Sequence, residues 1–227
     1  MEAINAKGKM KNAKWKILRF AICTLQFAIF LTGCATIQLG GAVQEGRRQL
    51  MYGDPKSALA HFQRAAEIDP AYRYNFSILD QSIWTYVGRA QYAAGRLGEA
   101  RTALERAVSG HRGDNLAKLY LGLVLARDGD RQRGLKEITA GLKGLEDWFD
   151  HLDRYHPYAR FWDPGRQVRA EIQRRLEVIS GKEINWSELI ASGEWLGRTL
   201  EEEIDLSERQ RRFEETRDGD RDGRDDK

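Results

Sequence analysis

Apolar residues recur along this chain with the spacing of an α-helix. In residues 55–68, Ala58, Phe62 and Ala65 follow one another at i, i+4 and i+7, which places all three on one helical face. Asp54 is suited to cap this helix, and Pro55 suits its first turn because the N–H that proline lacks would be unpaired there. The pattern predicts an amphipathic helix over these residues.

The pattern repeats. Residues 81–114 align with residues 115–148 at an offset of 34 residues, and a third copy of the second half of this unit lies in residues 53–70. The aligned positions carry small or large apolar residues in the same places: Gly88 with Gly122, Gly95 with Gly129, and Leu104 with Ile138. Small residues allow two helices to approach closely, so the repeat predicts stacked helical hairpins.

This period and residue pattern resemble the tetratricopeptide repeat, a hairpin of two antiparallel helices. The matches in the second unit are Trp84, Val87, Gly88, Ala90, Tyr92, Gly95, Ala100, Leu104 and Ala107. The resemblance implies an all-α fold, a short α-solenoid of three hairpins over residues 39–72, 81–114 and 115–148. We expect the eight extra residues 73–80 to form a loop or an extension of the next helix.

The residue composition changes after the repeats. Aromatic residues cluster after residue 147, and we expect residues 148–206 to form helices that cap the end of the solenoid. The alternative is that the aromatic cluster is an exposed binding surface. One helix is expected to have Asp163 as its N-cap, Pro164 in its first turn and Gly181 as its stop, and another begins at Asn185. Apolar residues become scarce from Ser207, so residues 207–227 are expected to be a charged, disordered tail.

The N-terminus has the pattern of an export signal. Six basic residues precede a short apolar run that ends in Leu31-Thr32-Gly33-Cys34. This ending resembles the lipobox of bacterial lipoproteins, which implies that residues 1–33 are removed, that Cys34 is lipidated, and that residues 34–38 form a short tether. The alternatives are an uncleaved membrane anchor and an ordinary buried cysteine. Ala35 after the cysteine resembles the sorting pattern for an outer membrane, where the organism has one.

Removal of residues 1–33 changes the charge of the chain. It takes six of 37 basic and one of 34 acidic residues, which leaves 31 and 33 and a formal charge of about −2. We therefore expect no nucleic-acid partner. Cys23 and Cys34 are the only cysteines, and neither is available for a disulfide within the mature fold.

Stacked hairpins curve and leave a concave groove lined by their first helices. By position in the repeat, the predicted partner-binding residues of this groove are Arg47, Met51, Arg89, Tyr92, Leu119, Leu123 and Arg127. Arginine beside aromatic and aliphatic side chains suits an extended peptide or a partner helix. We expect an envelope protein or peptide as the partner, with a membrane-anchored, periplasm-facing interaction scaffold as the function.

The sequence supports other functions less strongly. A subunit or pilot protein of a secretion or transport complex would differ only in its partner. His151 and His156 lie near aspartates, and Asp218, Asp220 and Asp222 follow the opening of a calcium-binding loop, but neither set is complete. We expect no enzyme activity, no cofactor and no metal site.

Overall fold

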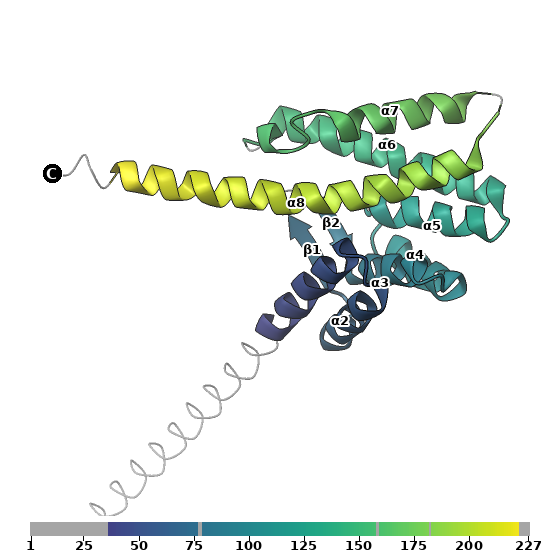
Figure 1. The fold of residues 1–227 in the computed structure, drawn as a ribbon, viewed down its shortest axis with the longest axis horizontal. Helices are drawn as coiled ribbons and strands as arrows, with labels where there is room; N and C mark the ends of the chain where they lie inside the picture. Colours follow the sequence, from purple (N-terminus) through teal and green to yellow (C-terminus); the bar gives the residue numbers. More distant parts are fainter. Residues whose placement is uncertain (1–35, 77–78, 158, 182, 223–227) are drawn as a thin grey trace, which may run out of the picture.

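Figure 1 shows the fold in a computed structural model, which describes residues 36–76, 79–157, 159–181 and 183–222. The predicted signal segment 1–33 and Cys34 lie outside the described residues. Over these residues the fold is all-α apart from one short hairpin of strands, and its helices pack in consecutive pairs. The predicted helical-repeat fold class is confirmed.

Three hairpins form the N-terminal part of the described chain. Residues 36–51 are helical and pair with α2 (Pro55–Ile68), α3 (Ile83–Ala93) pairs with α4 (Leu97–Gly110), and α5 (Asn115–Arg127) pairs with α6 (Arg131–Tyr155). The turn within each pair contains a glycine with positive φ, at 82° for Gly53, 76° for Gly95 and 96° for Gly129. Only glycine adopts this conformation without strain, so the same turn is encoded three times.

One close contact also recurs in all three hairpins. A glycine on the first helix lies against a large apolar residue on the second helix, and an added Cβ atom would come within 3 Å of that residue. The pairs are Gly46 with Phe62 at 2.5 Å, Gly88 with Leu104 at 2.5 Å and Gly122 with Ile138 at 2.6 Å. These are the aligned positions of the sequence repeat, so the repeat encodes the spacing between the two helices of each hairpin.

Asp114 joins consecutive hairpins. Its carboxylate accepts hydrogen bonds from Ala117 N at 2.9 Å, as the N-cap of α5, and from Ser82 N at 2.8 Å and Thr85 Oγ1 at 2.5 Å at the start of α3. Asp114 is fully buried, and burial raises the pKa of its carboxyl group, against the lowering effect of these hydrogen bonds.

The prediction of a loop or a helix extension at residues 73–80 is wrong. Residues 73–76 and 79–82 form two antiparallel strands, β1 (Arg73–Phe76) and β2 (Leu79–Ser82), in which Arg73 pairs with Ser82 and Phe76 pairs with Leu79. Tyr74 and Leu79 are buried, and Arg73 forms an ion pair with Asp80 across the two strands. In β1, Arg73 and Asn75 are exposed and Tyr74 between them is buried, which is the alternation of a strand with one face on the core.

The aromatic cluster after the repeats belongs to the core. Helix α6 continues to Tyr155, past the predicted end of the third unit, and is followed by the short helix η1 (Ala159–Phe161). Trp148 packs edge-on against Phe149 and Trp162, with ring centroids 4.6 Å and 5.0 Å away, and all three side chains are buried. Tyr155, in contrast, is 70% exposed.

The next helix, α7 (Gln167–Ser180), begins later than predicted and ends at Gly181 as predicted. Asp163 is not the N-cap residue, because a loop with positive φ at Asp163 and Arg166 precedes the helix. Its carboxylate still accepts hydrogen bonds from the backbone N–H groups of Val168 and Arg169, both at 3.0 Å. Asp163 therefore stabilises the helix start from outside the helix.

The last helix, α8 (Trp186–Asp222), corrects the prediction of a disordered tail from Ser207. Its start is as predicted, with the Asn185 side chain accepting the N–H of Glu188 at 3.2 Å. Long-range contacts hold the helix beyond Ser207: Tyr74 donates to Glu208 at 2.9 Å, and Arg160 pairs with Glu214 at 2.6 Å. These contacts give the charged segment partners that its composition does not reveal.

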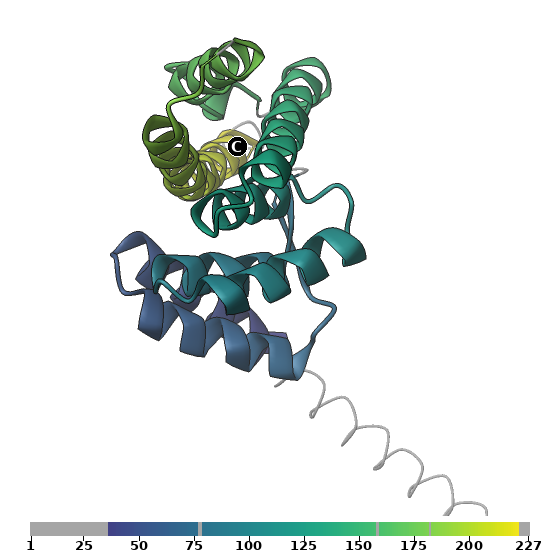
Figure 2. The ribbon, with the colours of Figure 1, turned by 90° about the vertical axis from the view of Figure 1, so that its right-hand side faces the viewer.

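Helix α8 does not pack only on the end of the stack. It lies across the molecule in Figure 1, contacts α5 and α7, and extends beyond the other helices at its C-terminal end. Seen end-on in Figure 2, it lies inside an arch formed by α5, α6 and α7. The concave side of the helical array is therefore occupied by the chain's own last helix.

Candidate functional site: the groove beneath helix α8

The groove side of α8 is apolar and closely packed. Its inward-facing side chains are at most 2% exposed: Leu189, Leu196, Leu200 and Ile204. Gly193 and Gly197, the G-x-x-x-G of the sequence, lie against Leu123 and Tyr120 of α5, where an added Cβ atom would approach to 2.8 Å and 2.1 Å. The two glycines allow α8 to pack closely against α5.

Three glutamates follow the same side of α8 at intervals of seven residues. Glu194 contacts Tyr92 and Arg127, Glu201 contacts Arg47 and Arg89, and Glu208 contacts Tyr74. Seven residues are close to two helical turns, so the three carboxylates share one face. Each of them meets a different part of the repeat array.

Glu201 lies at the centre of this row and is 1% exposed. One carboxylate oxygen accepts from Arg47 Nε at 2.7 Å, and the other accepts from Arg89 Nη1. The two arginines are themselves only 1% and 2% exposed. Three charged groups are therefore buried together, with one negative charge between two positive ones.

Further groups neutralise or bind the two guanidinium groups. Arg47 donates to Asp205 at 3.0 Å and to the Tyr74 hydroxyl at 3.1 Å, and Arg89 donates to the Gly197 carbonyl at 2.8 Å. Burial raises the pKa of the Glu201 carboxyl, but the positive charges and hydrogen bonds of Arg89 and Arg47 outweigh burial and leave that pKa below its usual value. Glu201 is held in its charged form.

Glu194 anchors the neighbouring part of α8. It accepts from the Tyr92 hydroxyl at 2.6 Å and from Arg127 Nη2 at 2.8 Å, and the Arg127 guanidinium lies 4.6 Å from the centre of the Tyr92 ring. Burial, together with the adjacent Glu194, raises the pKa of the Tyr92 hydroxyl above its usual value, so it remains a hydrogen-bond donor.

A pocket opens beside these residues, with a volume of about 340 Å³. Three arginines, two tyrosines, one glutamate and small or apolar residues line it: Leu50, Gly53, Pro55, Arg89, Tyr92, Ala93, Tyr120, Arg127, Glu194 and Arg198. Arg198 is exposed and forms no ion pair or hydrogen bond within the described part of the chain. Arg89 Nε is buried and has no acceptor among the described residues.

The structure separates the seven predicted groove residues into three groups. Arg89, Tyr92 and Arg127 line the pocket. Arg47 and Met51 line a second hollow, of about 400 Å³, together with Asp205 of α8. Leu119 and Leu123 are fully buried.

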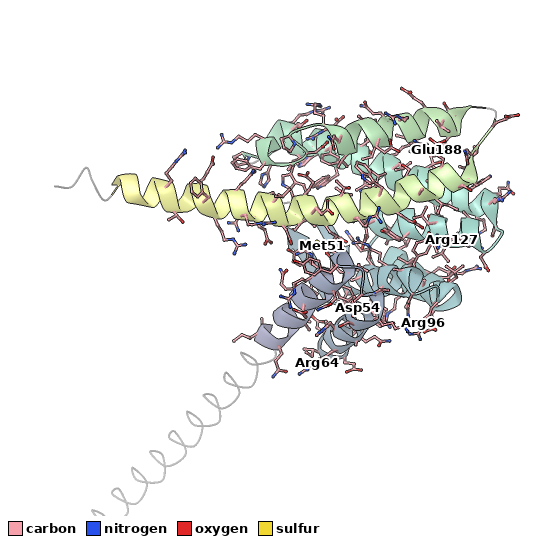
Figure 3. All side chains as sticks on the ribbon, in the orientation of Figure 1. Met51, Asp54, Arg64, Arg96, Arg127 and Glu188 are labelled. Atoms are coloured by element: carbon pink, nitrogen blue, oxygen red, sulfur yellow. The ribbon has the colours of Figure 1, made fainter. Side chains whose placement is uncertain are left out.

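The expectation of an open groove is therefore corrected. Arg47, Arg89 and Tyr92 are at most 3% exposed, and all three have hydrogen bonds to α8. Arg127 remains 40% exposed and is marked at the end of α5 in Figure 3, together with Met51 at the end of the first hairpin's first helix. The part of this surface that remains accessible lies beside α8.

The glutamates of α8 are the site residues that sequence reasoning missed. Their seven-residue spacing within the apolar stripe of Leu196, Leu200 and Ile204 was visible in the sequence. A carboxylate that recurs on the buried side of a helix calls for a cationic partner, and the predicted groove carried three arginines. The two patterns together were the available signal for docking α8 into the groove.

No protein-family model, curated protein or solved structure matches the chain. Within the described ranges, no helix is both long enough and apolar enough to cross a membrane. The same residues contain no group of three histidine, cysteine or carboxylate side chains that is placed to hold a metal ion. His151, one member of the weak metal pattern, packs its ring on Tyr155 instead.

Proposed function

We propose that this protein is a membrane-anchored, periplasm-facing interaction scaffold, with tetratricopeptide-like hairpins and a lipid at Cys34. The observation that carries the proposal is the pocket of arginines and tyrosines left open beside α8. Arginine and tyrosine are over-represented among the residues that dominate binding energy at protein interfaces. A volume of about 340 Å³ lies within the usual range of specific binding pockets, so the pocket is large enough for the side chains of a partner.

The proposed partner does not displace α8 from the groove, so α8 itself forms part of the binding surface. Burying each of the four apolar residues of its groove side contributes about 1.5 to 3 kcal/mol, which amounts to roughly 6 to 12 kcal/mol for the set. That sum is comparable with the whole free energy of unfolding of a typical domain. A partner therefore binds to the composite surface of the first hairpin, α3, α5 and α8 and leaves α8 in place.

The test is capture of partners from detergent-solubilised envelopes with the full-length protein. Arg198→Glu reverses the one pocket charge that has no structural partner, and Arg64→Glu is its matched control. Arg64 is an exposed arginine on α2, the lowest of the labelled residues in Figure 3 and away from α8, with no ion pair among the described residues. We expect Arg198→Glu to lose a partner that the wild type and Arg64→Glu both retain; identical partner sets for all three proteins would refute the proposed surface.

The anchor is tested independently. Cys34→Ser should leave a protein that is not lipidated, has a different mature mass and is released from the membrane fraction, because the acyl chains supply the membrane affinity. Mass spectrometry and membrane fractionation check this. Unchanged mass and membrane association would contradict lipidation without bearing on the pocket.

A further inference from the structure

The pocket beside α8 carries more positive than negative charge. Arg89, Arg127 and Arg198 supply three positive charges to its lining, and Glu194 supplies one negative charge. Glu201, which does not line the pocket, neutralises Arg89 through a buried ion pair. One positive charge is left over, on the wall formed by Arg198. A ligand with a single negative charge would neutralise the positive charge of Arg198.

The geometry of the existing pairs decides which arginine is available. Arg127 is already bound to Glu194 at 2.8 Å, and Arg89 donates to Glu201, Gln81 and the Gly197 carbonyl. Arg198 forms no such ion pair or hydrogen bond within the described residues and is exposed at the pocket wall. Its planar fork of N–H donors matches a carboxylate, to which it can donate two parallel hydrogen bonds.

The rest of the lining selects for an apolar group next to that carboxylate. Leu50, Pro55 and Ala93 form one part of the wall, and the rings of Tyr92 and Tyr120 form another, edge to face with centroids 5.6 Å apart. The Glu194 carboxylate in the same pocket disfavours a second negative charge. A glutamate or aspartate side chain next to an aliphatic residue fits these features better than a dianionic phosphate.

We infer that the pocket binds an acidic side chain of a partner protein, flanked by an apolar residue, and that Arg198 is the residue that recognises the carboxylate. This inference rests on the proposed function, because it names the chemistry of the partner at the same surface.

The experiment uses full-length protein in detergent and a fluorescein-labelled, C-terminally amidated peptide of about ten residues with Leu-Glu-Leu at its centre. The matched peptide carries Gln in place of Glu. Fluorescence anisotropy should show the Glu peptide binding roughly tenfold or more tightly than the Gln peptide, because a hydrogen-bonded charge pair is lost in the latter. Arg198→Glu should reduce the affinity for the Glu peptide by a similar factor, whereas Arg64→Glu should not change it.

Three results overturn the inference. They are equal binding of the two peptides, no binding of the Glu peptide at about 1 mM, and stronger competition by inorganic phosphate than by acetate at equal ionic strength. If envelope capture still depends on Arg198 in any of these cases, the scaffold proposal stands and only the carboxylate assignment fails. If envelope capture is also independent of Arg198, both fail. Circular dichroism of Arg198→Glu verifies that the fold is intact.

Discussion

Glu201→Ala is the substitution that most directly tests how α8 is held in the groove. It removes the carboxylate that accepts from Arg47 Nε at 2.7 Å and from Arg89 Nη1. Both arginines remain buried, at 1% and 2% exposure, with less negative charge around them. The change therefore leaves buried positive charge without its main counterion.

The size of the effect follows from what each arginine retains. Removing one partner of a buried ion pair generally costs about 3 to 5 kcal/mol. Arg47 keeps Asp205 and the Tyr74 hydroxyl, and Arg89 keeps the Gly197 carbonyl, so the lower end of that range applies. We expect the free energy of unfolding to fall by about 3 kcal/mol, and the melting temperature to fall by roughly 6 to 12 °C for a domain of this size.

Urea unfolding of the full-length protein in detergent, followed by circular dichroism, measures this difference. The matched control is Glu202→Ala, the next residue on the same helix, which is exposed and has no ion pair among the described residues. Surface substitutions of this kind usually change stability by less than about 0.5 kcal/mol. Tryptophan fluorescence should give the same transition midpoint if unfolding is cooperative.

A loss of less than 0.5 kcal/mol for Glu201→Ala would refute the reasoning, since it would mean that the two arginines are not sealed from water. A second variant separates charge from packing. Replacing Arg47, Glu201 and Arg89 together by Met, Leu and Met should restore much of the lost stability, because well-packed apolar residues can substitute for a buried charge cluster.

Two further predictions concern pH and the hairpin contacts. The pKa of Glu201 is lowered in the folded state, so its contribution to stability is fully present above the unfolded pKa of about 4.3 and is lost as pH falls through the folded pKa. At pH values below about 4.3, the urea midpoint of the wild type should therefore decrease more steeply with falling pH than that of Glu201→Gln. Gly122→Ala should destabilise the protein by about 1 to 3 kcal/mol, since its methyl group would lie 2.6 Å from the Ile138 backbone nitrogen. Gly98→Ala, on an exposed and unobstructed position of α4, should be neutral or stabilising by up to about 1 kcal/mol in the same thermal melts, and equal losses for the two variants would contradict the contact.

The hairpins could be predicted from the sequence because their information is local and repeated. Gly53, Gly95 and Gly129 each follow a helix and take the same positive-φ turn, and Gly88 and Gly122 each face the aligned apolar residue. Interactions within one hairpin involve residues that are close in sequence. The sequence pattern of a hairpin therefore predicts its structure without knowledge of the rest of the fold.

The course of α8 could not be predicted in the same way. Residues 207–222 have few apolar positions, and the partners that hold them, Tyr74 and Arg160, lie more than fifty residues away in the chain. The hairpin of β1 and β2 was missed for a related reason, because its strands are only four residues long. Short elements and long-range ion pairs leave little periodicity to read.

The contact between Arg47 and Glu201 spans 154 residues, and it has a consequence for the order in which the chain folds. An ordinary repeat array folds outward from any of its units, since each unit contacts only its neighbours. Here the first helix cannot complete its buried contacts until almost the whole chain has been synthesised. Long-range closure slows folding, so the N-terminal part of a nascent chain remains unfinished while its C-terminal part is still being made. For the exported, lipid-anchored protein proposed above, that delay would keep the chain in the unfolded form that translocation requires.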